Sequence, residues 1–516
     1  MATTYMLGRT PFERFPAVHL PSTLAKKLPI HNAARNAVAT TLHQVPHLIS
    51  DRSLDGGVSQ LARHTEARFG RGHSPAIETI TMPKKGLGPR PISLLSPETR
   101  TLYDALVEKL KPGLPSPSRA QPMSDHQEFG VPVWPDRGVQ IVDFDIAACY
   151  EYIDHNILAE ELLIQTLDAD SVSALMGLLL DMFPRGMGIP QAMDSSHLLG
   201  DAYLNQIERD MSREGYDVHR FADDFRIVTE SQSQAFEAIE HAMAIARRYG
   251  LVLADKKTNI RSAWDVREEI IAKEDAFQKY NEEAAEQLTA IEFMQIGYDD
   301  WSAIETEPDP QDVNFMALSR VIEDWATGDA NNYTVHTHFG TRALQALQAS
   351  DERLKDEWLV QVVAKEPVRL FNVGSYLVNR HENLRNWSTL RDLTRLPRQS
   401  PWARLWMARL ADSLEPVEAE SRDEVISWAN GLLDDRHETV RAEGAWFLVN
   451  NEQISPAAIG ELFVSATDIT KVGLAGVVGR LDAGSVSAVG KAIRDDSALT
   501  RLAYSWGEDQ CGSMLL

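Results

Sequence analysis

The chain has 516 residues, 43% of them apolar, and a formal net charge of −24. This length predicts two or three domains rather than one. No uninterrupted apolar run is long enough to cross a bilayer, so we expect no membrane partner. Two cysteines, Cys149 and Cys511, exclude a disulfide framework. The N-terminus lacks the pattern of a signal peptide, and a cytoplasmic location is expected.

The charge is unevenly distributed. Residues 1–120 contain 16 Lys and Arg against 8 Asp and Glu, whereas residues 262–516 contain 24 against 43. The overall charge argues against a simple nucleic-acid binder, but the basic N-terminal part could hold a phosphate backbone. The acidic C-terminal half should repel a generic one. Alternatively, its acidity only keeps a helical surface soluble.

The first clear pattern begins at residue 77. Residues 77–82 alternate like a strand, the following turn carries Lys84 and Lys85, and residues 90–94 restart a strand. Ser96 and Pro97 then open a helix. The pattern predicts a hairpin followed by a helix.

Residues 136–262 follow a strand–helix–helix–hairpin–helix–strand order. The expected elements are a strand over 138–146, helices starting at 154, 172 and 195, strands over 216–221 and 225–229, a helix over 233–249 and a strand starting at 251. This order is that of a split βαβ, or ferredoxin-like, palm. The predicted class is α+β, with fingers and palm of a right-hand polymerase followed by an all-α domain.

The predicted domains are an N-terminal extension with fingers (1–135), a palm (136–262), thumb-like helices with a linker (263–310) and a helical domain (311–516). The layout of the last domain is similar to HEAT-type repeats, whose period is about 40–47 residues. A plain helical bundle is the alternative. The acidic pairs at 434–435 and 495–496 are expected to cap helices rather than to take part in catalysis.

Three carboxylates fit the chemistry of nucleotidyl transfer. This reaction neutralises a triphosphate and activates a hydroxyl, which two Mg²⁺ ions about 3.5–4 Å apart can do. Asp145 at a strand end, with Asp223 and Asp224 at a hairpin turn, could supply a bridging set of oxygen ligands. Asp143 shares the strand face of Asp145 and is expected to lie outside the metal shell or in solvent.

These residues resemble the motifs of bacterial reverse transcriptases. The resemblance spans roughly residues 77–262 and rests on five segments in the right order. They are a fingers segment over 80–106, Asp143–Tyr150 with 152–155 after it, Gly188–Gln191 with 203–205 downstream, Phe221–Asp224, and 250–253 with Lys257 and Thr258. Phe221 stands where Tyr is commoner in this family. The resemblance implies an RNA-directed DNA polymerase.

The resemblance also implies roles. Asp145, Asp223 and Asp224 would be the catalytic carboxylates and would bind two Mg²⁺ (or Mn²⁺) ions, helped by the carbonyl of Ile146. Tyr150 would be a steric gate that selects dNTPs, although ordinary palm packing would also explain it. The remaining residues implied to contact the nucleotide are Gln191, Arg90, Lys84, Lys85 and Lys257, and for Lys257 a solvated turn lysine is an equal alternative.

Two departures narrow the biological role. Ala192 replaces the glycine that usually follows Gly-Ile-Pro-Gln, which puts ordinary templated processivity in doubt. The acidic helical half lacks the Cys/His cluster and basic tail of mobile introns. It resembles instead the abortive-infection and other antiphage reverse transcriptases, in several of which a HEAT-like half drives oligomerisation. We therefore expect a homo-oligomer.

The leading prediction is an antiphage reverse transcriptase that polymerises dNTPs on an RNA template or without one. Its DNA product could be primed on the protein and so attached covalently to it. A second prediction is a retron-like or intron-derived enzyme that copies a cognate noncoding RNA. A third, of another class, is a catalytically idle RNA-binding scaffold. The intact carboxylate set argues against the scaffold, because unused buried carboxylates are costly to keep ionised.

Overall fold

The computed structural model describes residues 18–39, 44–84, 88–134, 136–288, 290–295, 301–306, 310–328, 333–348, 353–482 and 486–510. The N-terminal part contains α1 (Ser22–Ala25), α2 (Ile30–Ala39), α3 (Ile49–Arg52), α4 (Val58–Gly70), β1 (Ile77–Pro83), β2 (Pro89–Leu95) and α5 (Pro97–Leu110). Strands β1 and β2 form an antiparallel hairpin in which Met82 pairs with Arg90. This is the hairpin that the sequence predicts for the fingers.

The central part contains η1 (Lys111–Gly113), η2 (Ser118–Ala120), α6 (Met123–Glu128), β3 (Gln140–Asp145), α7 (Cys149–Tyr152), α8 (His155–Thr166), α9 (Ala169–Met182), α10 (Asp194–Arg213), β4 (Asp217–Phe221), β5 (Asp224–Thr229), α11 (Gln232–Arg248), η3 (Asp255–Lys257) and β6 (Asn259–Ser262). Its four strands form one antiparallel sheet in the order β4-β5-β3-β6. The first strand thus lies between the third and the fourth, which is the split βαβ arrangement.

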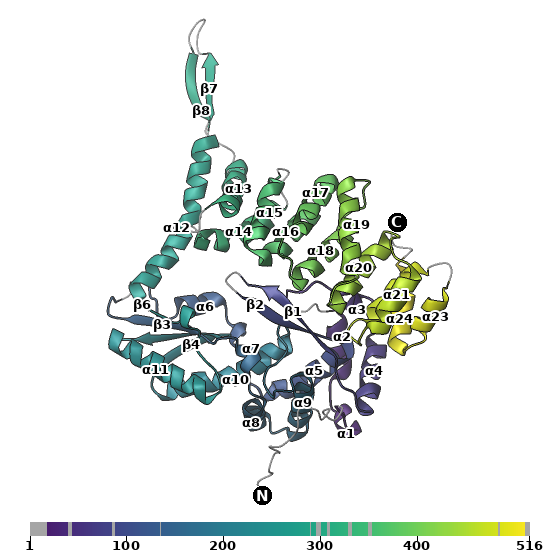
Figure 1. Ribbon diagram of the computed structural model, residues 1–516. Helices are drawn as coiled ribbons and strands as arrows, with labels where there is room; N and C mark the ends of the chain where they lie inside the picture. Colours follow the sequence, from purple (N-terminus) through teal and green to yellow (C-terminus); the bar gives the residue numbers. More distant parts are fainter. Residues whose placement is uncertain are drawn as a thin grey trace.

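Strand β3 is amphipathic in an unusual way. Val142 and Phe144 point into the main core, and Phe144 stacks on Phe225 of β5 with ring centroids 4.9 Å apart. Helices α10 and α11 cover that face of the sheet (Figure 1). Because side chains alternate along a strand, Asp143 and Asp145 project from the opposite face. One face of β3 therefore packs in the main core, and the other face carries the two carboxylates.

The C-terminal part contains α12 (Ala263–Leu288), β7 (Ala290–Gln295), β8 (Trp301–Thr306), α13 (Pro310–Thr327), α14 (Tyr333–Leu347), α15 (Asp356–Lys365), η5 (Pro367–Arg369), α16 (Leu370–Asn379), α17 (Asn383–Thr394), α18 (Pro401–Ser413), α19 (Glu420–Leu432), α20 (Glu438–Asn450), α21 (Pro456–Ser465), α22 (Lys471–Leu481), α23 (Ala488–Arg494) and α24 (Ala498–Asp509). Strands β7 and β8 form a hairpin where the sequence predicts a linker; Figure 1 shows it projecting beyond α12.

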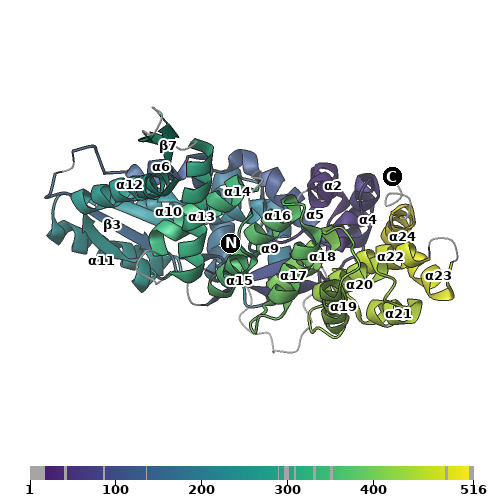
Figure 2. The same ribbon diagram turned by 90° about the horizontal axis from the view of Figure 1, so that it is seen from above.

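We call α13–α24 the helical half. Successive helices alternate between two layers, since most of them pack on both the next helix and the one after it (Figures 1 and 2). Whether this arrangement belongs to the HEAT-like class stays a prediction. The acidic pairs do not cap the N-termini of the following helices as predicted: the N-cap residues of α20 and α24 are His437 and Ser497, and Asp495 is instead the C-cap residue of α23. Within the described parts of the chain, every helix is too short or too polar to span a bilayer.

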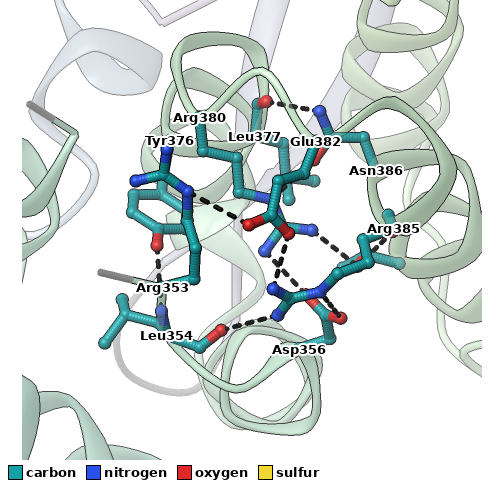
Figure 3. A network of polar contacts seen from close by, with 10 residues as sticks. Arg353, Leu354, Asp356, Tyr376, Leu377, Arg380, Glu382, Arg385 and Asn386 are labelled. Atoms are coloured by element: carbon teal, nitrogen blue, oxygen red, sulfur yellow. Dashed lines mark hydrogen bonds and ion pairs between the residues drawn. The ribbon is translucent and has the colours of Figure 1, made fainter. Parts of the chain in front are cut away.

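A polar network joins α15, α16 and α17 of the helical half (Figure 3). Arg380, which is fully buried, donates to Asp356 and Asn386 at 2.6 Å each. Asp356 also accepts from Arg385 at 2.9 Å. Burial alone would raise the pKa of Asp356, but the hydrogen bonds and charges of the two arginines hold it below its ordinary value. The network fixes three consecutive helices by charge-assisted contacts.

The helical half also packs against the N-terminal helices. Arg52 of α3 forms ion pairs with Asp412 of α18 at 3.2 Å and with Glu443 of α20 at 3.1 Å. Helix α22 approaches α3 closely at Gly473, where an added Cβ would lie 2.8 Å from the Ile49 side chain. A larger residue there would push the two helices apart. The two ends of the chain therefore meet, and the helical half contacts both the palm side, through α12, and the N-terminal helices.

Candidate active site

The three predicted catalytic carboxylates come from adjacent strands. Asp145 is the last residue of β3 and lies opposite Asp224, the first residue of β5. Asp223 lies in the tight turn between β4 and β5, and its carbonyl accepts from the Ile146 amide at 3.2 Å. Ala222 in the same turn has a φ of 58°, a left-handed conformation that costs free energy in a residue other than glycine. The turn is thus strained, as functional turns often are.

Electrostatics at this site favour a bound cation. Burial and the negative charge of Asp223 raise the pKa of Asp145 to about 7. Burial, together with Asp223, also raises the pKa of Asp224. Lys257 forms an ion pair with Asp145; burial lowers the pKa of this lysine, but the hydrogen bond and charge of Asp145 raise it above its ordinary value. Lys257 is therefore the nearest positive charge that offsets the negative charges of the three carboxylates.

The donor atoms suit a hard divalent ion. Asp145 is 6% exposed, and its Oδ1 atom has no hydrogen-bond partner. Among the described residues, no backbone N–H donates to the carbonyl of Ile146. Carboxylate and carbonyl oxygens are the ligands that Mg²⁺ prefers. The residues present therefore fit the predicted metal set of Asp145, Ile146, Asp223 and Asp224.

Asp143 is excluded from this set by its partners. It forms ion pairs with Arg226 at 2.6 Å and with Arg261 at 2.7 Å. Although burial would raise the pKa of Asp143, the hydrogen bonds and charges of the two arginines hold it below its ordinary value. Its charge is already neutralised, so it serves the sheet rather than a metal. Asp143 is therefore neither a solvated carboxylate nor part of the predicted metal set.

Tyr150 is held in place by contacts from two other elements. The Tyr150 ring packs beside Gly200 of α10, where an added Cβ would lie 3.5–3.7 Å from the phenol group, an ordinary van der Waals contact. The ring of His197 meets it edge-on at 6.1 Å. Arg119 donates to the Tyr150 hydroxyl at 3.3 Å, and burial raises the pKa of Tyr150 to about 12. The hydroxyl therefore stays protonated near neutral pH.

The Gly188–Gln191 loop lies against the helix that carries Tyr150. The Ile189 amide donates to the Tyr150 carbonyl at 2.9 Å, and Gly188 adopts a φ of 100° that favours glycine. Gln191 is half-buried. Ala192 has a φ of 66°, also in the left-handed region. The glycine expected at this position would suit that backbone better, so the departure seen in the sequence has a conformational cost.

The fingers cations lie apart from the carboxylates. Lys84 is exposed and Arg90 is half-buried, both on the β1–β2 hairpin. No hydrogen bond or ion pair among the described residues joins either of them to Asp145, Asp223 or Asp224. Lys85 lies outside the described residues. Of the three described cations predicted to contact the nucleotide, Lys84, Arg90 and Lys257, only Lys257 forms an ion pair with one of the carboxylates, Asp145.

Sequence reasoning missed a group that fixes the catalytic turn. Ser118 Oγ donates to Asp201 at 2.7 Å and accepts from the Ala222 amide at 2.9 Å. Arg220 is buried; it donates to Asp201 at 2.6 Å and to the Ala222 carbonyl at 3.0 Å. These residues come from η2, α10 and β4 and share no sequence pattern. They place the Ala222–Asp223 turn by three hydrogen bonds and one buried ion pair.

The fold and the carboxylates define a polymerase palm with the residues of a nucleotidyl transferase. Residues 82–297 match the family model described as reverse transcriptase (RNA-dependent DNA polymerase). This segment is a reverse transcriptase domain, and the protein carries the domain of an RNA-directed DNA polymerase.

Comparison of the whole chain adds little. No curated protein sequence matches it. Among solved structures, it is similar to apo telomerase from Candida tropicalis, with 10% identity over 72% of this chain and 73% of that chain and a TM-score of 0.27. It is also similar to telomerase from Candida albicans in complex with a TWJ fragment of telomeric RNA, with 12% identity over 86% and 68% and a TM-score of 0.28.

Proposed function

We propose that this protein is a reverse transcriptase of antiphage defence that polymerises dNTPs by two-metal nucleotidyl transfer. The main observation in support of this chemistry is that Asp145 lies beside the Asp223–Asp224 turn. Its buried Oδ1 atom has no hydrogen-bond partner among the described residues. Asp145, Asp223, Asp224 and the Ile146 carbonyl would hold the ions. When bound, two Mg²⁺ or Mn²⁺ ions neutralise the triphosphate and activate the attacking hydroxyl.

The protein's own residues prepare the site for this reaction. The Ser118, Asp201 and Arg220 group holds the turn so that the carboxylates need no rearrangement. Lys257 covers Asp145 and is 61% exposed, so it can turn toward a triphosphate or pyrophosphate. Arg90 on the fingers hairpin would bind phosphates once the hairpin and palm close on a nucleotide.

Two further residues would shape the choice of substrate. The ring of Tyr150 is fixed between Gly200 and His197 and would crowd a ribose 2′-hydroxyl, which favours dNTPs over NTPs. Gln191 follows the loop that is bonded to Tyr150 and would contact the base pair being formed.

The defence role rests on what accompanies the palm. The reverse transcriptase domain is joined to an acidic helical half, as in the antiphage class that the sequence resembles. Ala192, with its left-handed backbone, stands beside the expected template position. We propose synthesis on an RNA template or without one, a DNA product primed on RNA or on the protein, and a homo-oligomer formed through a HEAT-like helical half.

The chemistry is tested by incorporation of labelled dNTPs with Mg²⁺ or Mn²⁺ on several RNA templates and without template. The double variant Asp223→Ala/Asp224→Ala should lose incorporation by at least about a thousandfold, as should wild-type protein treated with EDTA. Asp217→Ala, an exposed acid of the same hairpin, is the matched control and should keep activity. Wild-type incorporation equal to that of the double variant under every condition would favour the idle scaffold instead.

The biological role needs a second experiment. Nucleic acid that co-purifies with the protein would be sequenced after protease and nuclease controls. Untemplated DNA that stays bound to protein after denaturation would support the antiphage proposal with protein priming. One recurrent noncoding RNA with its complementary DNA would favour the retron-like alternative. Phage challenge of cells with wild-type or double-variant protein then tests defence itself.

A further inference from the structure

A cavity lies between the fingers hairpin and the helical half. Its volume is about 880 Å³. Thr81, Lys84 and Pro89 of the hairpin line one wall. Residues of the segment from α15 through α18 line the other wall, including Lys365 and Arg398. In Figure 1 the hairpin formed by β1 and β2 faces this part of the helical half, and β1 packs on α18. No palm residue lines this cavity, so it is separate from the carboxylate site.

The charge of this cavity is opposite to that of its surroundings. The helical half is strongly acidic, yet the lining has three cations and no Asp or Glu. Lys84 and Arg398 are exposed, and neither has a hydrogen bond or ion pair within the described part of the chain. Among the described residues, Lys365 donates to two carbonyl oxygens, those of Trp325 and Gly328, and to no carboxylate. Within the described part of the chain, no carboxylate therefore pairs with these three cations.

Neighbouring arginines of the helical half behave differently. Arg369 pairs with Glu366 at 3.0 Å, and Arg404 pairs with Asp435 at 3.1 Å. Arg395, three residues before Arg398, pairs with Glu424. The remaining lining is apolar or uncharged, with prolines from both walls and leucines from the helical half. Unpaired cations beside such surface suit a chain that offers both phosphates and base faces.

We propose that this cavity binds the uncopied, single-stranded RNA template as it approaches the palm. The occupant is a template rather than a product because the product end must lie at the carboxylates, whereas no palm residue lines this cavity. Lys84, Lys365 and Arg398 contact the backbone phosphates, and the apolar lining contacts the bases. The proposal rests on the proposed polymerase function and extends it, because it makes the helical half part of the template path.

The test measures the binding of a fluorescent single-stranded RNA by anisotropy, in EDTA and without dNTPs. Arg398→Glu should weaken binding by at least about tenfold at low salt, and Lys84→Ala should weaken it further. The plot of log K against log salt concentration has a negative slope, and each lost phosphate contact should make it less steep by about 0.7. Arg436→Glu, an equal charge change at an exposed position of the same half, should leave both quantities unchanged.

Three outcomes would overturn the proposal. Arg398→Glu could bind as wild type does, or Arg436→Glu could weaken binding equally, which would indicate only the overall charge. Alternatively, Arg398→Glu could weaken a single-stranded DNA of the same sequence but not the RNA, which would assign the cavity to the product. The binding assay needs no catalysis, so Asp223→Ala/Asp224→Ala should bind RNA normally. A failure of the proposed chemistry would thus be seen separately.

Discussion

Removing the charge of Asp201 should loosen the catalytic turn. The Asp201 and Arg220 side chains are each 3% exposed and lie 2.6 Å apart. Loss of one partner from such a buried pair costs about 3–5 kcal/mol. Arg220 keeps Glu208 at 2.9 Å as a second carboxylate. We therefore expect Asp201→Asn to cost about 3 kcal/mol, a factor of roughly 150 in the opening of the turn.

Hydrogen exchange of residues 217–229, followed by mass spectrometry, measures this opening. The exchange rate should rise about a hundredfold in Asp201→Asn, and kcat for dNTP incorporation should fall while the fold is kept. The matched control is Asp210→Asn on the same helix, because Asp210 meets more exposed partners at 3.0 Å and 3.7 Å and its loss should cost less than about 1 kcal/mol. Equal exchange in the two variants would refute the role given to the buried pair.

Three more predictions concern single side chains. Tyr150→Ala should lower the preference for dNTPs over NTPs by about 10- to 200-fold, measured as a ratio of kcat/KM, whereas Tyr152→Ala on the same short helix should leave it unchanged. Ala192→Gly should relieve about 1–2 kcal/mol of left-handed strain against an entropic cost of about 0.4–1 kcal/mol, so urea unfolding should show equal or higher stability; a clear loss would contradict this. The pKa of Asp356 lies below the ordinary 3.8, so its stabilisation is full above that value and is lost as pH falls through the lower, folded value; Asp356→Asn should destabilise the protein at pH 7 and flatten acid unfolding below about pH 4.

Local patterns were enough to predict that the three carboxylates lie together, while their catalytic role stays a prediction. Asp145 follows a buried strand, and Asp223–Asp224 follows another, so a split βαβ sheet had to bring them together. The group around Arg220 was not predictable in this way. Its members come from three elements and carry no periodicity, and their contacts depend on how α10 and η2 pack on the turn.

The helical half was predictable in type but not in placement. Apolar stripes indicated helices. No local sequence pattern, however, indicates that Arg52 pairs with Glu443 or that α3 packs closely against Gly473. Cap positions failed for a related reason, because Asp435 bonds the His437 amide and Arg404 instead of capping α20. An acidic residue near the start of a helix can form hydrogen bonds or ion pairs with several different groups, and tertiary packing determines which of them form.

The meeting of the chain's two ends has a consequence for its synthesis on the ribosome. Arg52 and its partner Asp412 are separated by 360 residues. At about 5–20 residues per second, the N-terminal helices wait about 20 to 70 s before their final partners emerge. During that interval the face of α3 that packs on α20 and α22 is uncovered. A ribosome that stalls within the helical half would therefore release a polymerase domain whose fingers side is not yet packed.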